Sequence, residues 1–251
     1  MYNNPLVSII TPVLNAEETI EITIQSVLSQ SYKNIEHIVV DNGSSDGTLE
    51  IVNKYKNKIK IFSEGKKGIF TTMNRGLRAA TGDIIGILNS DDFYADDDVI
   101  KTVVEKMNED NVDACWGDLE YVDKNNINKV IRYWRSSGFS ISSFAKGWMP
   151  PHPTLFVKKW VYDKYGFFNT DFTIAADYEL VLRFLYKYRI PACYIPKVLV
   201  KMRTGGLSNQ NIKTIIRKSR EDYKICKLYG FNFFTLLNKN LTKISQFIFH
   251  Y

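Results

Sequence analysis

The sequence predicts an α/β fold with a mostly parallel central sheet and flanking helices. Short apolar runs of strand length alternate with stretches of helical periodicity through the first hundred residues. Glycine-rich or acidic turns follow several of these runs. The 251 residues, of which 45% are apolar and 24% charged, suffice for one globular domain and exclude wholesale disorder.

The first half of the chain has the order strand, helix, strand, helix. We expect strands at 6–13, 35–41, 59–62 and 83–88, and helices that begin near residues 15, 49 and 68. Asn15 and Glu18 have the spacing of a capping box, and Thr81-Gly82 is typical of a helix end. This alternation predicts βαβ units, in which ligands bind beyond the carboxyl ends of the strands.

The second half is less regular. We expect strands around a polar turn at 124–126, further short strands at 154–157 and 192–200, and a helix at 176–188. From residue 212 the pattern is helical again. We therefore predict a main domain over 1–205 and a basic, aromatic-rich helical tail over 206–251.

The net charge of +6 belongs to the end of the chain. From residue 201 onward ten Lys and Arg stand against two Asp and Glu, whereas the first 200 residues carry 23 against 25. Such a tail without a reading module does not predict nucleic-acid binding. The three cysteines form no CxxC pair, and neither a secretory signal nor a long uncharged apolar stretch stands out, so we expect a cytoplasmic protein.

Four carboxylates crowd two turns at predicted strand ends: Asp41, Asp46, Asp91 and Asp92. Adjacent carboxylates repel each other unless a cation lies between them, and Mg²⁺ or Mn²⁺ prefers oxygen ligands. The alternative is that Asp91 and Asp92 only cap a helix that follows the Asp96–Asp98 run. The sequence lacks GxxxxGK[ST] and a GxGxxG after a strand, which disfavours P-loop enzymes and dinucleotide dehydrogenases.

One motif points to another class of enzyme. The segment GSSDG at 43–47 fits GxSxG and lies between a predicted strand and helix, which is the setting of the α/β-hydrolase nucleophile. Only His152 and His250 follow Ser45 in the chain, and no HGGG-type loop precedes it. A plain turn in which Ser45 or Asp46 caps the next helix explains the same residues, so the hydrolase remains an alternative.

Five segments in order resemble family 2 glycosyltransferases. They are VSIITPVLNAEETI, IVVDNGSSDGT, EGKKGIFTTMNRGLRAATGDIIGILNSDD, PHPTLFVKK and AADYELVLRF, and the resemblance runs from about residue 6 to 208. It implies a GT-A (Rossmann-like) fold with a donor half over about 1–110 and an acceptor half over 111–205. It also implies a nucleotide-diphosphate sugar donor, a divalent metal (Mn²⁺ or Mg²⁺) and inversion at the anomeric carbon.

The resemblance assigns the donor site residue by residue. It places the nucleobase, expected to be uracil, against Asp41 and the backbone of Thr11, Pro12 and Val13. Lys67 or Arg75 is expected near the nucleotide as a cation, although each is equally explained as a solvated surface charge. The NSDD turn stands at the family's Asp-x-Asp motif, so the remaining donor and metal residues are Asn89, Ser90, Asp91 and Asp92. Asn89 departs from the usual Asp, which leaves the metal affinity open.

For the acceptor side we select Asp177 as the catalytic base. An inverting transfer needs one carboxylate to deprotonate the acceptor hydroxyl, and a helix N-terminus stabilises such a charge. Glu179 is the alternative base, and a plain helix cap is the other explanation for Asp177. His152, Trp116 and Arg203 are expected near the acceptor or the diphosphate, with Arg203 at the start of a flexible loop over 203–208 that orders over the diphosphate. A buried histidine, a core tryptophan and a domain-edge turn are the alternatives.

The tail predicts a location. Five cations at spacings of four and three share one helix face, and an aromatic-rich apolar stripe follows over 231–251. This is typical of an interfacial membrane contact, here through 211–251, while a packed helical hairpin or a homodimer interface are alternatives. We expect an enzyme of bacterial surface-polysaccharide synthesis (O-antigen, capsule or exopolysaccharide), peripheral at the inner face of the membrane, with a glycan acceptor on a lipid carrier. A catalytically silent nucleotide-sugar-binding protein is the alternative.

Overall fold

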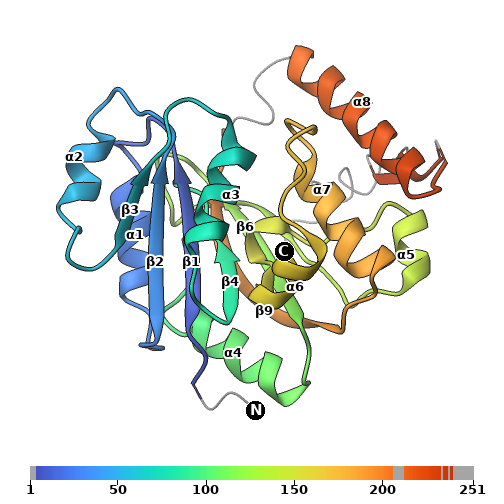
Figure 1. Cartoon of the computed structure of the whole chain (residues 1–251), viewed down its shortest axis with the longest axis horizontal. Helices are drawn as coiled ribbons and strands as arrows, with labels where there is room; N and C mark the ends of the chain where they lie inside the picture. Colours follow the sequence, from blue (N-terminus) through green and yellow to red (C-terminus); the bar gives the residue numbers. More distant parts are fainter. Residues whose placement is uncertain (1–3, 206–211, 233, 237, 240–251) are drawn as a thin grey trace.

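A computed structural model describes residues 4–205, 212–232, 234–236 and 238–239. Within these residues nine strands form one mixed sheet (Figure 1). Four parallel strands run in the order β3-β2-β1-β4, and they are β1 (Val7–Val13), β2 (Ile35–Asp41), β3 (Lys60–Ser63) and β4 (Ile84–Ile87). The sheet continues with β8 (Phe156–Lys158), β6 (Ala114–Val122), β9 (Ala192–Arg203) and β5 (Asp92–Tyr94), while β7 (Val130–Trp134) pairs with β6.

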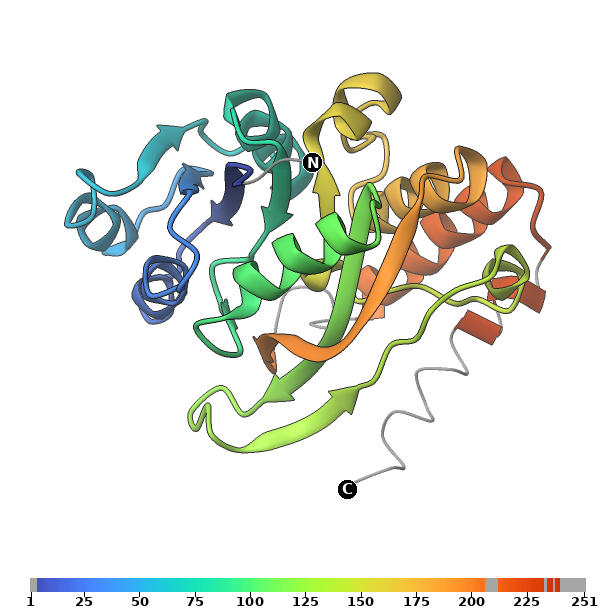
Figure 2. The same cartoon turned by 90° about the horizontal axis from the view of Figure 1, so that it is seen from below.

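Helices cover both faces of the sheet. They are α1 (Ile20–Leu28), α2 (Thr48–Asn53), α3 (Ile69–Ala79), α4 (Val99–Glu109), α5 (Ile141–Ala145), α6 (Lys159–Tyr165), α7 (Ala176–Val181) and α8 (Ile212–Leu228), with a 3₁₀ turn η1 (His152–Thr154) and a π-helical stretch η2 (Leu182–Lys187). Ile10 packs toward α3, whereas Ile9 packs toward α4, because successive residues of a strand face opposite sides. Figure 2 shows α4 lying across β6 and β9.

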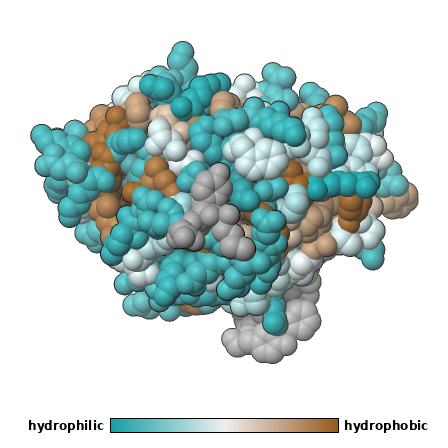
Figure 3. Space-filling model, turned by 60° about the horizontal axis from the view of Figure 1, so that its bottom comes forward, coloured by the Kyte–Doolittle hydropathy of each residue, from teal (hydrophilic) through white to brown (hydrophobic). Residues whose placement is uncertain are grey.

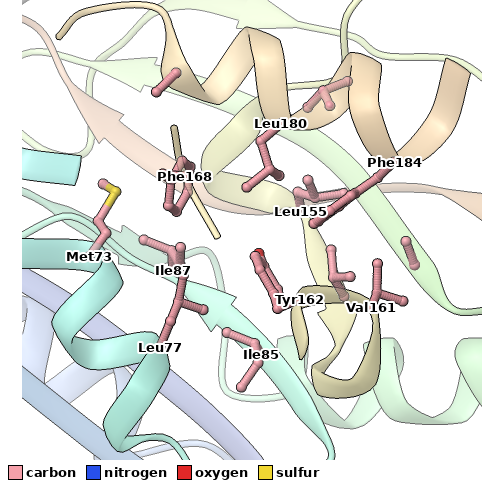
Figure 4. Close-up of a cluster of buried hydrophobic side chains, with 14 of the residues drawn as sticks. Met73, Leu77, Ile85, Ile87, Leu155, Val161, Tyr162, Phe168, Leu180 and Phe184 are labelled. Atoms are coloured by element: carbon pink, nitrogen blue, oxygen red, sulfur yellow. The ribbon is translucent and has the colours of Figure 1, made fainter. Parts of the chain in front are cut away.

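The largest core cluster joins the two halves of the chain. Figure 4 shows its side chains pointing inward from α3 and β4 on one side and from α6, α7 and η2 on the other. Met73, Leu77, Ile85, Ile87, Leu155, Val161, Tyr162, Phe168, Leu180 and Phe184 belong to it. Asn74 of α3 also exchanges two hydrogen bonds with the backbone of Phe168, at 2.9 and 3.0 Å. The parts of the chain before and after residue 110 therefore share one core.

The structure confirms the predicted strands of the first half and corrects the start of its first helix. Asn15 does not cap that helix, which begins at Ile20 with Thr19 at the cap position and no side-chain cap. Asn15 instead has a left-handed backbone, and its side chain reaches the loop after β2. The short strand β5 and the helices α5 and α6 were not expected from the sequence.

The tail is less separate than the sequence predicts. Ile225 and Cys226 of α8 are fully buried and belong to the large core cluster. Figure 1 shows α8 beside α7. The expected apolar stripe over 231–251 falls mostly outside the described residues, as does 206–211. In the part of the chain that the structure describes, no helix is long and apolar enough to span a membrane. On the face drawn in Figure 3, hydrophobic side chains are scattered among hydrophilic ones.

Candidate functional site

The carboxyl ends of β1 and β2 form the first wall of the candidate site. Asp41 ends β2 and is only 1% exposed, and its carboxylate accepts the backbone N–H groups of Gly43 and Ser44 at 3.0 and 3.1 Å. Thr11, Pro12 and Val13 are buried at the end of β1. The hydroxyl of Thr11 lies 2.9 Å from Nε2 of His37, so the backbone of this strand, not the Thr11 hydroxyl, remains for a ligand.

Polar side chains fasten the loop after β1 to the loop after β2. Asn15 accepts the N–H of Ser45 at 2.9 Å, and Glu17 accepts the N–H of Gly47 at 2.6 Å. Asp46 in turn accepts the N–H of Glu17 at 3.2 Å. The hydroxyl of Ser45 donates to Asn15 at 3.4 Å, and no histidine is its partner among the described side chains. These residues explain the GSSDG turn as a structural clamp.

The two candidate cations of the donor side differ. Lys67 has an exposed side chain, and its backbone N–H donates to Asn42 at 2.8 Å, which keeps it beside the end of β2. Arg75 forms an ion pair with Glu64 at 2.8 Å and lies over the ring of Phe62. Lys67 is therefore the freer of the two to meet a nucleotide.

The NSDD turn follows β4 and is held from two sides. The backbone oxygen of Ser90 accepts the hydroxyls of Thr19 and Thr23, at 2.9 and 3.0 Å. On the other side Arg203, the last residue of β9, donates to the backbone oxygen of Asp91. Pairing of β5 with β9 sets Asp92 opposite Met202 and so brings Arg203 to the turn. The sequence predicted Arg203 in a flexible loop, whereas the structure places it in a strand, where it is 5% exposed.

The two carboxylates of this turn lie in different environments. Asp91 is half-buried; burial raises its pKa, and the charge of Arg203 opposes that rise. Asp92 has no exposed surface and accepts the side chain of Asn89 at 2.9 Å. Burial and then the charge of Asp91 raise the pKa of Asp92 well above its usual range. Neither residue caps α4, which begins at Val99 with Asp98 at its cap position.

The carboxylate oxygens of this turn fit a divalent cation that is bound mainly by one carboxylate. Across the described residues, no group of three or more His, Cys, Asp or Glu side chains could enclose a metal. Mg²⁺ and Mn²⁺ are often bound by one or two carboxylates, with water and substrate phosphates completing the shell. Asp91 is accessible enough for that role. The Oδ1 atom of the buried Asp92 has no hydrogen-bond partner, which makes Asp92 a second ligand only if its side chain turns outward.

Asp177 and His152 lie close enough for the charge of Asp177 to act on the His152 ring. Asp177 is the second residue of α7 and is half-buried. Burial lowers the pKa of His152, and the nearby charge of Asp177 opposes this. The ring of His152 also packs edge-on against Phe168, with centroids 5.6 Å apart. The antiparallel register of β4 and β8 sets Gly86 opposite Phe156, which brings η1 and His152 beside the end of β4 and the NSDD turn.

The other two candidates on the acceptor side have structural partners. Glu179 is buried and binds Arg183 at 2.9 Å and the hydroxyl of Tyr229 at 2.7 Å, so its carboxylate is held away from an acceptor. Trp116 is fully buried, and its ring packs against Phe139 and Trp148. It therefore belongs to an aromatic core and offers no face to a sugar.

One residue near Asp177 was not expected from the sequence. Glu221 of α8 accepts hydrogen bonds from the segment 173–175, directly before α7. Its position in a charged helical stretch gave no sign of this, because contacts between residues this far apart leave no local pattern.

Comparison with known proteins identifies the family. The model of glycosyl transferase family 2 matches residues 8–173. An uncharacterised glycosyltransferase of Mycobacterium tuberculosis H37Rv is 32% identical over 190 residues, which cover 73% of this chain and 70% of the relative. One from Haemophilus influenzae is 46% identical over 103 residues, 39% of this chain and only 41% of its own length.

Solved structures agree on the fold. A fragment of S. aureus TarS superposes with a TM-score of 0.69 at 20% identity, covering 89% of this chain and 64% of that one, and TarS has also been solved with UDP-GlcNAc. The mannosyltransferase PcManGT of Pyrobaculum calidifontis, in complex with GDP-Man and Mn²⁺, gives 0.63 at 19% identity over 89% of this chain and 64% of that one. The chain belongs to glycosyl transferase family 2 and has the GT-A fold.

Proposed function

We propose that this protein transfers a sugar, with inversion, from a nucleotide-diphosphate sugar to a hydroxyl of a glycan acceptor. The observation that carries the proposal is the convergence at one sheet edge of Asp41, the turn at Asp91 and the pair of His152 and Asp177. The relatives named above are glycosyltransferases, and the solved neighbours bind UDP-GlcNAc or GDP-Man. This geometry favours an active enzyme over a silent sugar-nucleotide-binding protein.

Each residue has a role that its surroundings support. Asp41 with the backbone at 11–13 binds the nucleobase, which we propose is uracil, and Lys67 approaches the nucleotide. Asp177 takes the proton of the acceptor hydroxyl as its oxygen attacks the anomeric carbon, from the face opposite the leaving diphosphate. When bound at Asp91, a divalent metal would balance the charge of that diphosphate. Burial lowers the pKa of His152, which favours its neutral form beside the charged Asp177.

We also propose where the reaction takes place. Arg217, Arg220 and Lys224 are exposed on one side of α8, and such a basic face favours an anionic lipid surface. The acceptor is then a lipid-linked glycan at the inner face of a bacterial membrane, as in the synthesis of a surface polysaccharide. A homodimer through the tail remains the competing prediction.

A panel of donors tests the function. We expect one of UDP-GlcNAc, UDP-glucose, UDP-galactose or GDP-mannose, together with Mn²⁺, to raise the melting temperature, because a ligand that binds the native state stabilises it. The same donor should release its nucleoside diphosphate faster when a polyprenyl-diphosphate-linked sugar is added in phosphatidylglycerol vesicles than when the sugar is supplied in neutral vesicles. Donor binding without release, to this acceptor or to water, would overturn the proposed enzyme.

A further inference from the structure

The acceptor-side base depends on a carboxylate from a distant helix. Glu221 of α8 is 8% exposed, and both of its oxygens point at the three residues that precede α7. Oε1 accepts the N–H and the hydroxyl of Thr173, at 3.1 and 2.8 Å. Oε2 accepts the N–H groups of Ile174 and Ala175, at 2.9 and 3.0 Å. One carboxylate thus satisfies four donors on residues that precede Asp177 by two to four positions.

These bonds supply what the local sequence lacks. The N–H groups at the start of a helix have no partner inside it and are usually met by a Ser, Thr, Asp or Asn side chain at the cap. Here the cap position holds Ala175, which has no polar side chain, and no side-chain cap bond is made. Glu221 takes over part of that function from 46 residues away. Burial alone would raise the pKa of Glu221, but its hydrogen bonds outweigh burial and keep that pKa below its usual value.

A second link between the C-terminal part and α7 lies next to the first. Asp222 forms a buried ion pair with Lys239 at 2.8 Å. The ammonium of Lys239 lies 3.2 Å from the centre of the Tyr178 ring, and Tyr178 follows Asp177 in the chain. The charge of Asp177 also acts on Lys239. The start of α7 is therefore held on two sides by residues beyond position 220.

We infer that Glu221 is a positioning residue for the transfer reaction: it fixes the segment 173–175 so that Asp177 faces the acceptor hydroxyl. The inference rests on the proposed role of Asp177 as the base. Displacement of a catalytic group by about 1 Å can cost about a hundredfold in rate, so a looser segment should lower turnover without weakening the donor site. Donor contacts lie on the loops after β1, β2 and β4, which Glu221 does not touch.

The chain offers a matched control. Glu36 is also a nearly buried carboxylate that accepts backbone and hydroxyl hydrogens from a loop, here at Thr81 and Gly82, and it pairs with Lys60. Its place near the start of β2 is at the edge of the sheet opposite Asp41. Replacement of either Glu by Gln leaves one acceptor oxygen where there were two and turns an amide toward backbone donors. Both variants should lose stability, but only one should lose turnover.

The experiment measures release of nucleoside diphosphate from UDP-GlcNAc, UDP-glucose, UDP-galactose and GDP-mannose with Mn²⁺, with water as acceptor, at a temperature at which all variants are folded. We expect Glu221→Gln to lower kcat about tenfold or more with an unchanged donor Kd, and Glu36→Gln to keep kcat within about twofold of wild type. In the Asp177→Asn background Glu221→Gln should cost nothing further, because both changes remove the same function. Equal losses in the two Glu variants, or an additive loss in the double variant, would overturn the inference.

A milder pair covers the case in which Glu221→Gln does not fold. Thr173→Val removes one of the four bonds, whereas Thr173→Ser keeps the hydroxyl. We expect the Val variant to lower kcat and the Ser variant to restore it, and equal kcat values in the two would contradict the inference. If wild type and Asp177→Asn differ in turnover but Glu221→Gln matches wild type, only the inference fails. If wild type releases nucleoside diphosphate from none of the four donors, with water or with the lipid-linked acceptor, the proposed function itself fails.

Discussion

The donor side and the acceptor side of this sheet edge are built in different ways. On the donor side the carboxylates of Asp41 and Asp92 accept hydrogen bonds from close neighbours in the chain, Asp41 from Gly43 and Ser44 and Asp92 from Asn89. Only the backbone of the turn at Asp91 is held from far away, by Arg203. On the acceptor side Asp177 follows a segment that is held by Glu221, 46 to 48 residues later. The donor-side carboxylates of Asp41 and Asp92 are therefore set by local turns, whereas the segment before Asp177 depends on how α8 packs.

We expect the largest difference between the two sides from a substitution at Asp177. Replacement by Asn removes the base, so we expect turnover to fall by about 10²–10⁴-fold. Donor affinity should stay within about twofold, since the donor residues lie on other loops. Initial rates of nucleoside diphosphate release, together with titration of the donor by calorimetry, measure the two effects. As a control, Glu179→Gln should disturb stability more than donor binding, because Glu179 is buried against Arg183. Unchanged turnover in Asp177→Asn would show that another group is the base.

A smaller difference is expected within the donor side, between adjacent carboxylates. Asp91 is half-buried, while Asp92 has no exposed surface and is bonded to Asn89. We expect Asp91→Asn to lower turnover by about a hundredfold and to raise the Mn²⁺ concentration needed for half activity, since a ligand charge is lost. Asp92→Asn is nearly the same shape and can still accept from Asn89, so its effect should be several times smaller. Titration of both variants with Mn²⁺ measures the two effects. A larger effect of Asp92→Asn than of Asp91→Asn would place the metal ligand at Asp92.

The last prediction concerns stability at low pH, not turnover, and compares two histidines, one on each side. Burial lowers the pKa of His37 in β2 to about 3, while His152 on the acceptor side has the opposing charge of Asp177. Below about pH 6.5 His37 binds a proton in the unfolded chain but not in the native protein. The free energy of unfolding should therefore fall as pH falls from 6.5 toward 3. One such group contributes a slope of about 1.4 kcal/mol per pH unit.

Urea unfolding at several pH values measures this slope. His37→Gln should have a flatter dependence of unfolding free energy on pH than wild type, whatever its stability at pH 7. His152→Gln should change the slope less, because Asp177 raises the pKa of His152 toward its ordinary value. Parallel curves for wild type and His37→Gln would mean that His37 becomes protonated in the folded state.

Much of the donor half could be predicted from the sequence for a physical reason. Strands β1, β2 and β4 are short apolar runs, and turns with Asp, Asn and Gly follow them, so pattern and turn chemistry agree. The prediction that Asn15 caps the first helix was wrong, although its spacing to Glu18 fits a capping box. Ser45 of the loop after β2 donates a hydrogen bond to the same side chain. The Asn15 side chain therefore accepts this hydrogen bond and does not cap its own helix.

The acceptor half was less predictable. A Trp side chain such as Trp116 can stack on a sugar. Only its packing against Phe139 and Trp148 shows that it belongs to the core. Arg203 was expected in a loop, but pairing of β9 with β6 and β5 extends the strand to this residue and fixes it at Asp91. Neither outcome is encoded within a few residues of the side chain concerned.

The fold class, the family and the polar turns at the strand ends could be predicted from the amino-acid sequence alone. These depend on periodicity and turn chemistry, which act over a few residues. Which carboxyls remain accessible depends on tertiary packing. Asp91 and Asp177 are partly exposed, whereas Asp92 and Glu179 are buried. Tertiary packing also made α8 part of the acceptor side through Glu221. Burial and hydrogen bonding across long sequence separations exist only once the chain has folded, so no local pattern carries them.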